Sequence, residues 1–492
     1  MNRTYIQFLV CLTLVFLSTG CEDNWLDEQS SNQLTAEEQF ETAEGFKDAL
    51  IGSYIGLTAQ ELYGKDLSWN MVDLLSQQYA GLPVTAQYAG MQQFQYETLR
   101  ANGQIEATWS KAYNTIANVN LALEMTEKNQ AVLGSIDYAL IRGELLGLRV
   151  FLHFDMMRLF NPGNLKDRPE LLNEYAIPYV TTFDKNIKSQ LSFTETFKLM
   201  EADLQEALTL LEEDPVVSEE PVSYYAEVNR DGFYDSREQR MNYYAVKALF
   251  ARVLQWQGKQ DEAAIVAQEV IDDSFAMLID ADSHPVATDR IFYQEVLFMI
   301  DVEGLADIIN TLLSATDLDT ANPNTLYYTS NYVDETFETD NVNVGIPDVR
   351  FNTLMVTQSR GVVNRKLFQN YQEEDPQFNQ IPIIKIPEMY YIAAEAYAKG
   401  SQLDLAISLL NTVRISRGII EQIPDDASQE DVLLEVEKEY HKEFLSEGQW
   451  FYYLKRNGIT EIPGVFDNTI TIDDQQYVLP YPDNEVEFGN RN

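Results

Sequence analysis

Cysteine is almost absent from this 492-residue chain, which contains only Cys11 and Cys21. Cys11 lies in a short apolar run at the start of the chain, which we interpret below as a cleaved signal. At most one thiol then remains in the mature protein, so an intramolecular disulfide and a cysteine-based metal site are both excluded. The fold must therefore rest on packing and polar contacts, without covalent cross-links.

Histidine is scarce as well. His153, His284 and His441 are far apart in the sequence and lack the spacing of metal ligands. We therefore expect each of them to be a packed or surface residue, and we predict no metal site.

The common catalytic and nucleotide-binding motifs are also missing. The chain contains no G-x-S-x-G, H-E-x-x-H, Walker or G-x-G-x-x-G sequence. Asp317-x-Asp319 begins like a calcium-binding loop, but Asn322 and Tyr328 stand where such a loop needs glycine and a bidentate glutamate. Because close acidic pairs are inevitable among 78 carboxylates, they do not indicate a glycosidase. The sequence thus predicts no catalytic residue and no cofactor.

Basic residues are few, with 34 lysines and arginines against 78 acidic residues and a net charge of −44. This balance argues against binding to nucleic acid, whose affinity comes from neutralised phosphates. It also argues against direct adhesion to anionic lipid. We interpret the charge as solubility at an exterior surface; the alternative is attraction of cations or basic peptides.

The only long apolar run is at the start of the chain. Residues 6–17 are mostly apolar, follow Arg3, and lead into Leu17-Ser18-Thr19-Gly20-Cys21, which is similar to a bacterial lipoprotein cleavage site. Ser18 departs from that pattern, which favours an apolar residue there. The run is too short to span a membrane. We predict that residues 1–20 are a signal peptide and that Cys21 is acylated, anchoring the protein by lipid; the alternative is an ordinary secretory signal.

Most of the remaining chain has the periodicity of amphipathic helices. Residues 35–38 have capping-box spacing and predict a helix with Phe46, Leu50 and Tyr54 on one face. Apolar residues at steps of three and four predict further helices around residues 109–123, 138–159 and 197–211.

Two later segments resemble each other at an offset of 142 residues. Ala251, Gly258, Ala264 and Ile271 correspond to Ala393, Gly400, Ala406 and Val413. Each segment predicts two helices around a glycine-marked turn, with small residues where the helices approach, as in tetratricopeptide repeats. Gly400 suits a C-terminal cap. We predict a mostly α fold built on such hairpins, with long loops and a few short strands; two unrelated hairpins are the alternative.

Two long stretches, residues 60–104 and 280–385, have weak helical periodicity and are rich in turn-forming residues. Residues 291–300 contain an apolar run that could form a strand. Loops of this length usually carry function on a scaffold, and aromatic rings beside amides suit carbohydrate. The candidate ligand-binding residues are Trp69, Tyr79, Tyr88, Tyr96, Tyr327, Tyr328 and Tyr332. The alternative is that these rings only pack the loops against the helices.

Taken in order, the segments resemble the SusD/RagB-like surface lipoproteins of Bacteroidetes over nearly the whole chain. The matching segments are residues 21–27, 109–120, 176–181, 203–211, 243–249, 348–350, 388–396, 410–414 and 439–448. The most specific are 388–396 (EMYYIAAEA), 410–414 and 439–448. Gln449 and Tyr453 depart from the family, where many members have arginine and aspartate, which indicates a subgroup.

The resemblance implies a single helical-repeat domain over residues 21–492 with a looped ligand face. It also implies an outer-membrane lipoprotein facing the cell exterior that delivers a glycan to a SusC-like TonB-dependent transporter. RagB-like members take peptides instead, so peptide capture stays open, as do a surface glycoside hydrolase and a structural repeat protein without a ligand. No ligand residue can be assigned by motif.

Overall fold

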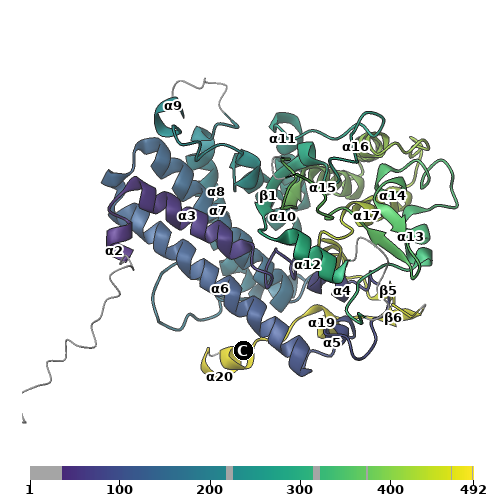
Figure 1. The fold of residues 1–492 in the computed structure, drawn as a ribbon, viewed down its shortest axis with the longest axis horizontal. Coiled ribbons are helices and arrows are strands. Elements are labelled where there is room, and N and C mark those ends of the chain that lie inside the picture. Colours follow the sequence, from purple (N-terminus) through teal and green to yellow (C-terminus); the bar gives the residue numbers. More distant parts are fainter. Residues whose placement is uncertain are drawn as a thin grey trace, which may run out of the picture.

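The computed structural model describes residues 36–217, 225–313, 322–372, 375–466, 468–489 and 491. The predicted signal peptide, Cys21, Thr35 and the Asp317–Asp319 turn lie outside this part of the chain. The described chain is mostly helical, as predicted (Figure 1). Its longer helices are α3 (Ala43–Leu57), α6 (Leu99–Lys128), α7 (Ser135–Phe160), α8 (Phe193–Leu210), α10 (Tyr243–Trp256), α11 (Gln260–Asp273), α15 (Ile386–Lys399), α16 (Leu403–Ser416) and α17 (Gln429–Glu443).

The first predicted helix is broken into two pieces, so the prediction of one continuous helix is wrong. α2 (Ala36–Gln39) ends before Thr42, whose side chain accepts a hydrogen bond from the Gly45 backbone N–H and caps α3. A Cβ on Gly45 would lie 1.6 Å from the Gln39 carbonyl oxygen, so the chain folds back tightly at this glycine. Phe46, Leu50 and Tyr54 nevertheless form the buried face of α3, as expected.

The two helical hairpins are confirmed, but their register is not the predicted one. Helix starts in the second hairpin lie 143 residues beyond those in the first, from Tyr243 to Ile386 and from Gln260 to Leu403. Gly400 is the C-cap of α15 but has a φ of −83°, and the left-handed turn residue is Ser401 (φ 61°). Ser401 is therefore the counterpart of Gly258 (φ 84°), because the backbone sets this position rather than the residue type.

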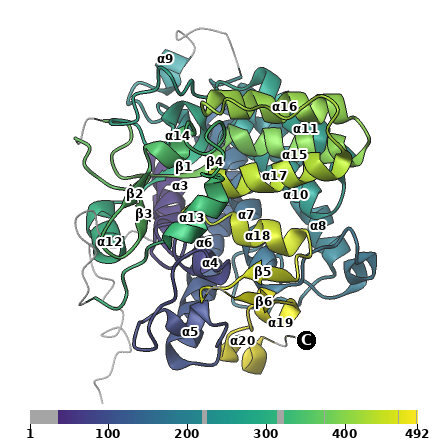
Figure 2. The same ribbon diagram turned by 90° about the vertical axis from the view of Figure 1, so that its right-hand side faces the viewer.

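The helices form a continuous array in which each packs on its neighbours in sequence. α3 contacts α6, which contacts α7; α8 follows, then α10, α11, α15 and α16. α17 packs against both helices of the second hairpin, and Figure 2 shows these three stacked beside α10 and α11. This architecture is the tetratricopeptide-like scaffold that the sequence predicts.

Only short elements interrupt the long loops. The first loop contains α4 (Met71–Leu75) and α5 (Ala89–Gln92), and the second contains α12 (Leu305–Leu312), α13 (Ser330–Phe337) and α14 (Val349–Asn352). Three two-stranded antiparallel sheets occur in the described chain: β1 (Val296–Asp301) with β4 (Gln380–Lys385), β2 (Met355–Thr357) with β3 (Val362–Asn364), and β5 (Glu461–Pro463) with β6 (Thr469–Thr471). β1 confirms the strand predicted within residues 291–300. The remaining helices are α9 (Tyr225–Val228), α18 (Trp450–Arg456), α19 (Asp474–Tyr477) and α20 (Asp483–Phe488).

A buried ionic cluster joins α17 to the second hairpin and to the strands. Arg417 forms ion pairs with Glu295 (2.6 Å) and Glu443 (3.0 Å). Arg350 and Lys385 also pair with Glu443, at 3.1 and 2.5 Å. Burial raises the pKa of the Glu443 carboxyl, but the three cations outweigh it and hold that pKa well below its usual value. The cluster therefore holds α17, the second hairpin and the strands in place beneath the loops.

Candidate ligand-binding site

The two long loops of the sequence meet in space. The Ala80 backbone N–H donates to the Tyr327 carbonyl oxygen (2.8 Å), and the Gln87 backbone N–H donates to Asn324 Oδ1 (2.6 Å). A third segment, residues 463–465 with 468 and 469 between β5 and β6, lines the same hollow as parts of both loops. We refer to residues 60–104, 322–345, 463–466, 468 and 469 together as the loop face.

Three of the seven candidate aromatic residues, Trp69, Tyr79 and Tyr328, are fully buried under this face. The Tyr79 hydroxyl donates to the Trp69 carbonyl oxygen (2.7 Å), and its ring centroid lies 5.0 Å from that of Tyr328. The Tyr328 hydroxyl lies 2.9 Å from Ser446 Oγ. Burial raises the pKa of both phenols, so they stay neutral. These rings join the loops to the scaffold, and Tyr79 also lies in the lining of a hollow on this face, whereas Trp69 and Tyr328 do not.

Tyr332 is partly exposed and lines an open hollow between the three segments, together with the buried Tyr79. The hollow has a volume of about 520 Å³. Its lining, which we call the amide hollow, consists of Gln77, Gln78, Tyr79, Ala80, Thr329, Asn331, Tyr332, Glu335, Pro463, Gly464, Val465, Asn468 and Thr469. The Tyr332 hydroxyl lies 2.6 Å from His441 Nε2. Burial lowers the pKa of His441 to about 3, so the imidazole is neutral and can accept this hydrogen bond.

The floor of the amide hollow has an unpaired acceptor. Gln78 is buried, and its Nε2 donates to Asp73 Oδ1 (3.1 Å) and Ser76 Oγ (2.8 Å). Its Oε1 has no hydrogen-bond partner in the protein. A buried acceptor without a donor costs free energy.

Phe466 stands beside the amide hollow and was missed by the sequence reasoning. Its side chain is 66% exposed, the highest value among the phenylalanines with exposed side chains. A Cβ on Gly81 would lie 2.6 Å from Phe466 Cε1, so the ring rests against a position that only glycine leaves free. The one signal in the sequence is the Pro463-Gly464 pair, which marks a turn that can display the ring.

A second hollow of about 550 Å³ lies on the same face and is more strongly charged. Its lining, the charged hollow, consists of Glu61, Lys65, Asp66, Thr85, Gln87, Tyr88, Leu99, Arg100, Gly103, Gln104, Ala107 and Asn324. Lys65 Nζ lies 3.3 Å from the Tyr88 hydroxyl and 3.4 Å from Asp66 Oδ1. Burial raises the pKa of Asp66 to about 6, although Lys65 opposes the shift. Tyr88 is thus brought to a ligand-sized hollow, but it is largely covered.

The last two predicted residues lie apart from both hollows. Tyr96 is buried, and its hydroxyl donates to the Gln476 carbonyl oxygen. Tyr327 is partly exposed, and the Arg360 guanidinium lies 5.0 Å from its ring centroid. Neither residue lines the amide hollow or the charged hollow.

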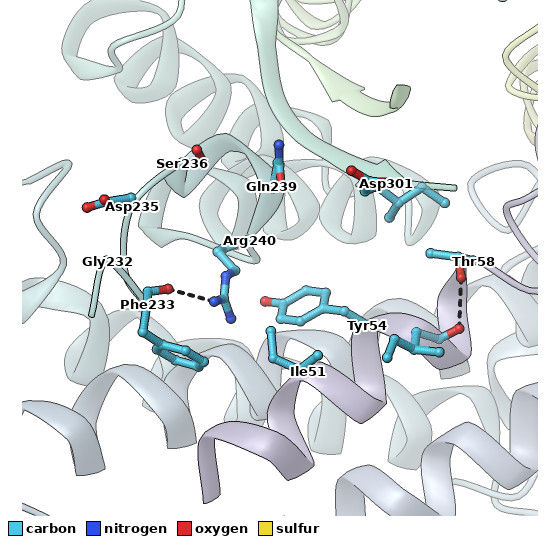
Figure 3. Close-up of a pocket in the computed structure, with 12 residues that line it drawn as sticks. Ile51, Tyr54, Thr58, Gly232, Phe233, Asp235, Ser236, Gln239, Arg240 and Asp301 are labelled. Atoms are coloured by element: carbon cyan, nitrogen blue, oxygen red, sulfur yellow. Dashed lines mark hydrogen bonds between the residues drawn. The ribbon is translucent and has the colours of Figure 1, made fainter. Parts of the chain in front are cut away.

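A third hollow, of about 400 Å³, lies between α3, residues 232–240 and the end of β1 (Figure 3). Ile51 and Tyr54 form its wall on α3, and the Arg240 guanidinium lies between the rings of Tyr54 and Phe233. Arg240 donates to the Phe233 carbonyl oxygen (2.7 Å). The hollow shares no residue with the loop face. It therefore belongs to the scaffold.

The histidines have structural contacts. His153 Nε2 accepts a hydrogen bond from the Val180 backbone N–H (2.9 Å), and burial lowers its pKa to about 3. His284 Nε2 lies 2.8 Å from the Asp289 carbonyl oxygen. Within residues 36–491, where described, no three His, Cys, Asp or Glu side chains are grouped to hold a metal ion. None of the described helices combines the length and apolar character needed to cross a bilayer.

Two family models match most of the chain. Residues 24–228 match the SusD-like model described as "Starch-binding associating with outer membrane", and residues 292–477 match the model of the SusD family. No curated protein matches the chain.

Solved structures of similar fold come from Bacteroides. A SusD superfamily protein of Bacteroides thetaiotaomicron is 22% identical, with a TM-score of 0.72 over 91% of this chain and 98% of its own. A SusD-like carbohydrate-binding protein of Bacteroides vulgatus is 18% identical, with a TM-score of 0.70 over 91% and 96%. The surface glycan-binding protein A of B. thetaiotaomicron, in complex with laminarihexaose, is 17% identical, with a TM-score of 0.65 over 91% and 98%. At these identities the likeness establishes the fold.

Proposed function

Because this chain belongs to the SusD family, we propose that it binds an oligosaccharide on its loop face and passes it to a SusC-like TonB-dependent transporter. The observation that carries the proposal is the amide hollow. Amide and hydroxyl side chains line it together with the Tyr332 ring, and the exposed Phe466 follows its lining residue Val465 in the chain. Sugar hydroxyls pair with amides, and sugar C–H faces stack on rings.

The proposed binding is weak. Each ring contact adds on the order of 0.5–1.5 kcal/mol beyond area burial, and association costs several kcal/mol of lost freedom. Two or three such contacts give a Kd of roughly micromolar to millimolar. Weak binding suits a protein that hands its ligand on.

A ligand library tests the proposal. The full mature protein is screened by thermal shift against neutral oligosaccharides, acidic oligosaccharides and peptides, because a ligand that binds only the native state raises the Tm. We expect oligosaccharides to raise the Tm and calorimetry to confirm their binding. A response to peptides alone would overturn the glycan proposal in favour of peptide capture.

We further propose that the protein binds its glycan without cleaving it. The described chain has no grouped metal ligands, and the sequence has no hydrolase motif. Incubation with the best-binding oligosaccharide should therefore release no new reducing ends. Reducing ends that appear with the wild type and disappear when the Glu335 carboxylate of the amide hollow is replaced (Glu335→Gln) would show an enzyme instead.

We also propose that acylated Cys21 holds the mature protein, residues 21–492, on the outer face of the outer membrane. The apolar run of residues 6–17 and the Gly20-Cys21 junction support this anchor. Cys21→Ala should release the protein from the membrane fraction. A variant that still sediments with the outer membrane in a strain lacking the transporter would contradict the lipid anchor.

A further inference from the structure

The charged hollow contains a guanidinium that no carboxylate of the described residues neutralises. Arg100, in the first turn of α6, is exposed and lines this hollow. Within the described chain its one hydrogen bond is to the Thr85 carbonyl oxygen (3.3 Å), and it forms no ion pair there. A guanidinium presents its N–H groups in a planar fork that matches an oxyanion. Arg100 is therefore available to an anionic group on a ligand.

Lys65 is the second cation of the charged hollow, and its contacts are long. Its ammonium lies 3.3 Å from the Tyr88 hydroxyl and 3.4 Å from Asp66 Oδ1. Burial raises the pKa of Asp66 to about 6, although Lys65 and Gln104 oppose the shift. The nearby Glu61 adds to it. At about pH 6 half of the Asp66 side chains are therefore protonated, and the Lys65 charge is then free to face a ligand.

The two hollows of the loop face differ in charge. The lining of the charged hollow has two basic side chains, Lys65 and Arg100, against two acidic ones, Glu61 and Asp66. The amide hollow has Glu335 as its one charged side chain. The net charge of −44 opposes an anionic ligand at long range, but salt screens this effect beyond about 8 Å at physiological ionic strength. The lining therefore determines where an anionic group is bound, and the charged hollow is favoured.

One oligosaccharide can reach both hollows. Ala80 lines the amide hollow and Thr85 the charged hollow, while Thr329 and Asn324 do the same on the second loop. The members of each pair are five residues apart in the sequence, so their Cα atoms are at most about 18 Å from each other. The hydrogen bond from the Ala80 N–H to the Tyr327 carbonyl oxygen (2.8 Å) joins the two loops here. A few linked sugar units can therefore extend from one hollow to the other.

We infer that the loop face binds an oligosaccharide that carries an anionic group, a carboxylate or a sulfate ester, with this group in the charged hollow and neutral sugar units in the amide hollow. The inference rests on the proposed function, since it takes a glycan as the ligand, and it adds the class of glycan. Arg100 and Lys65 donate to the anionic group. An anion beside Asp66 favours the protonated form of that carboxyl, so a proton on Asp66 strengthens binding of the anion by the same factor.

Matched pairs of oligosaccharides test the inference. Oligomers of galactose and galacturonic acid, of glucose and glucuronic acid, and of mannose and mannuronic acid differ within each pair in the carboxylate, and sulfated galactose oligomers carry the alternative anion. Each is titrated into the full mature protein by calorimetry. We expect tighter binding of an acidic oligomer than of its neutral partner. Arg100→Gln should weaken the acidic oligomer by about tenfold or more and leave the neutral one nearly unchanged.

The matched control is Arg230→Gln, because Arg230 is an exposed arginine outside the loop face. This variant should bind every oligomer like the wild type. Circular dichroism shows whether both variants are folded. Equal losses in Arg100→Gln and Arg230→Gln would show that only the overall charge matters, and would overturn the assignment to the charged hollow.

A gain of affinity provides a test that an unfolded variant cannot mimic. The sulfate group stays ionised over the range used, so wild type should bind the sulfated oligomers several-fold more tightly at about pH 5.5 than at about pH 7.5. Asp66→Asn removes the carboxylate that pairs with Lys65. This variant should bind the same oligomers more tightly at the higher pH and should lose the pH dependence. Weaker binding by a folded Asp66→Asn would contradict the inference.

The remaining outcomes separate the inference from the proposed function. Neutral oligomers that bind as tightly as their acidic partners would overturn the inference and leave the protein a glycan-binding component. Binding of acidic peptides, with no response to any oligosaccharide, would overturn the proposed function together with the inference.

Discussion

The buried ionic cluster and the loop face use polar side chains in opposite ways. In the cluster, Arg417 pairs with two carboxylates while Glu443 pairs with three cations, all of them buried. On the loop face, Gln78 Oε1 is buried without a hydrogen-bond partner in the protein. Polar groups that saturate one another fix a structure, whereas unsaturated ones can bind a ligand. We therefore interpret the cluster as the part of the molecule that stabilises the fold and the loop face as the part that binds ligand.

The largest expected effect comes from breaking the cluster. Arg417→Met leaves Glu295 and Glu443 without one of their buried partners, and we expect a loss of about 3–5 kcal/mol in the free energy of unfolding. Urea denaturation measures it. The control is Lys128→Met, because Lys128 pairs with Glu124 on the surface of α6 and should contribute less than about 1 kcal/mol. Similar losses for the two variants would contradict the special role of the cluster.

The next largest effect is expected at Trp69, which is buried under the loop face. Trp69 is fully buried, and Trp69→Ala should cost about 3–5 kcal/mol through the cavity that it leaves. The same denaturation measurement applies, with the exposed Phe488→Ala as a control that should stay within about 0.5 kcal/mol of the wild type. If Trp69→Ala keeps full stability but loses ligand, then this ring binds ligand rather than packing the loop.

A smaller effect is expected at the edge of the amide hollow. Phe466→Ala should weaken binding of the best oligosaccharide by roughly two- to tenfold, since a ring contact is worth about 0.5–1.5 kcal/mol. Calorimetry gives the affinity, and the Tm should stay unchanged because the ring is largely exposed. Phe183→Ala, at another exposed ring outside the loop face, should bind like the wild type. Unchanged affinity in Phe466→Ala would place the site elsewhere.

The smallest effect concerns the charged hollow. The folded pKa of Asp66 is about 6, above its usual value of 3.8, so the proton binds more tightly in the folded state. The contribution of Asp66 to stability is therefore fully present below about pH 4 and is lost as the pH rises through about 6. The stability of the wild type relative to Asp66→Asn should fall by about 1 kcal/mol between pH 5 and pH 7. A constant difference over this range would show that Asp66 has an ordinary pKa.

Sequence periodicity was a good guide to the scaffold. Ile116 and Val119 on α6 are buried as their spacing predicts, and both hairpins are where the repeat placed them. The errors are small and local. Thr42 starts a new helix, and Ser401 has the left-handed backbone conformation that Gly258 has at the equivalent position of the first hairpin. Short side-chain and backbone contacts decide such details, and periodicity does not report them.

The candidate site was predicted less well. The sequence located the loops, yet it could not rank the seven aromatic residues by exposure. Tyr332 lines the amide hollow, while Trp69 and Tyr328 are enclosed beneath it. Phe466 was not selected because its turn lies far along the chain from both loops. No local pattern distinguishes a ring that packs from a ring that is displayed.

The sequence by itself determined the helical-hairpin scaffold and the family, because helix periodicity and motif order are properties of the chain. Only the tertiary structure decided which side chains line the hollows. Ala80 meets Tyr327, Gly81 leaves room for Phe466, and Tyr328 reaches Ser446. Each contact joins residues more than a hundred positions apart. Burial of a loop side chain depends on such partners, and their approach is set by how the helices stack, not by the residues beside it in sequence.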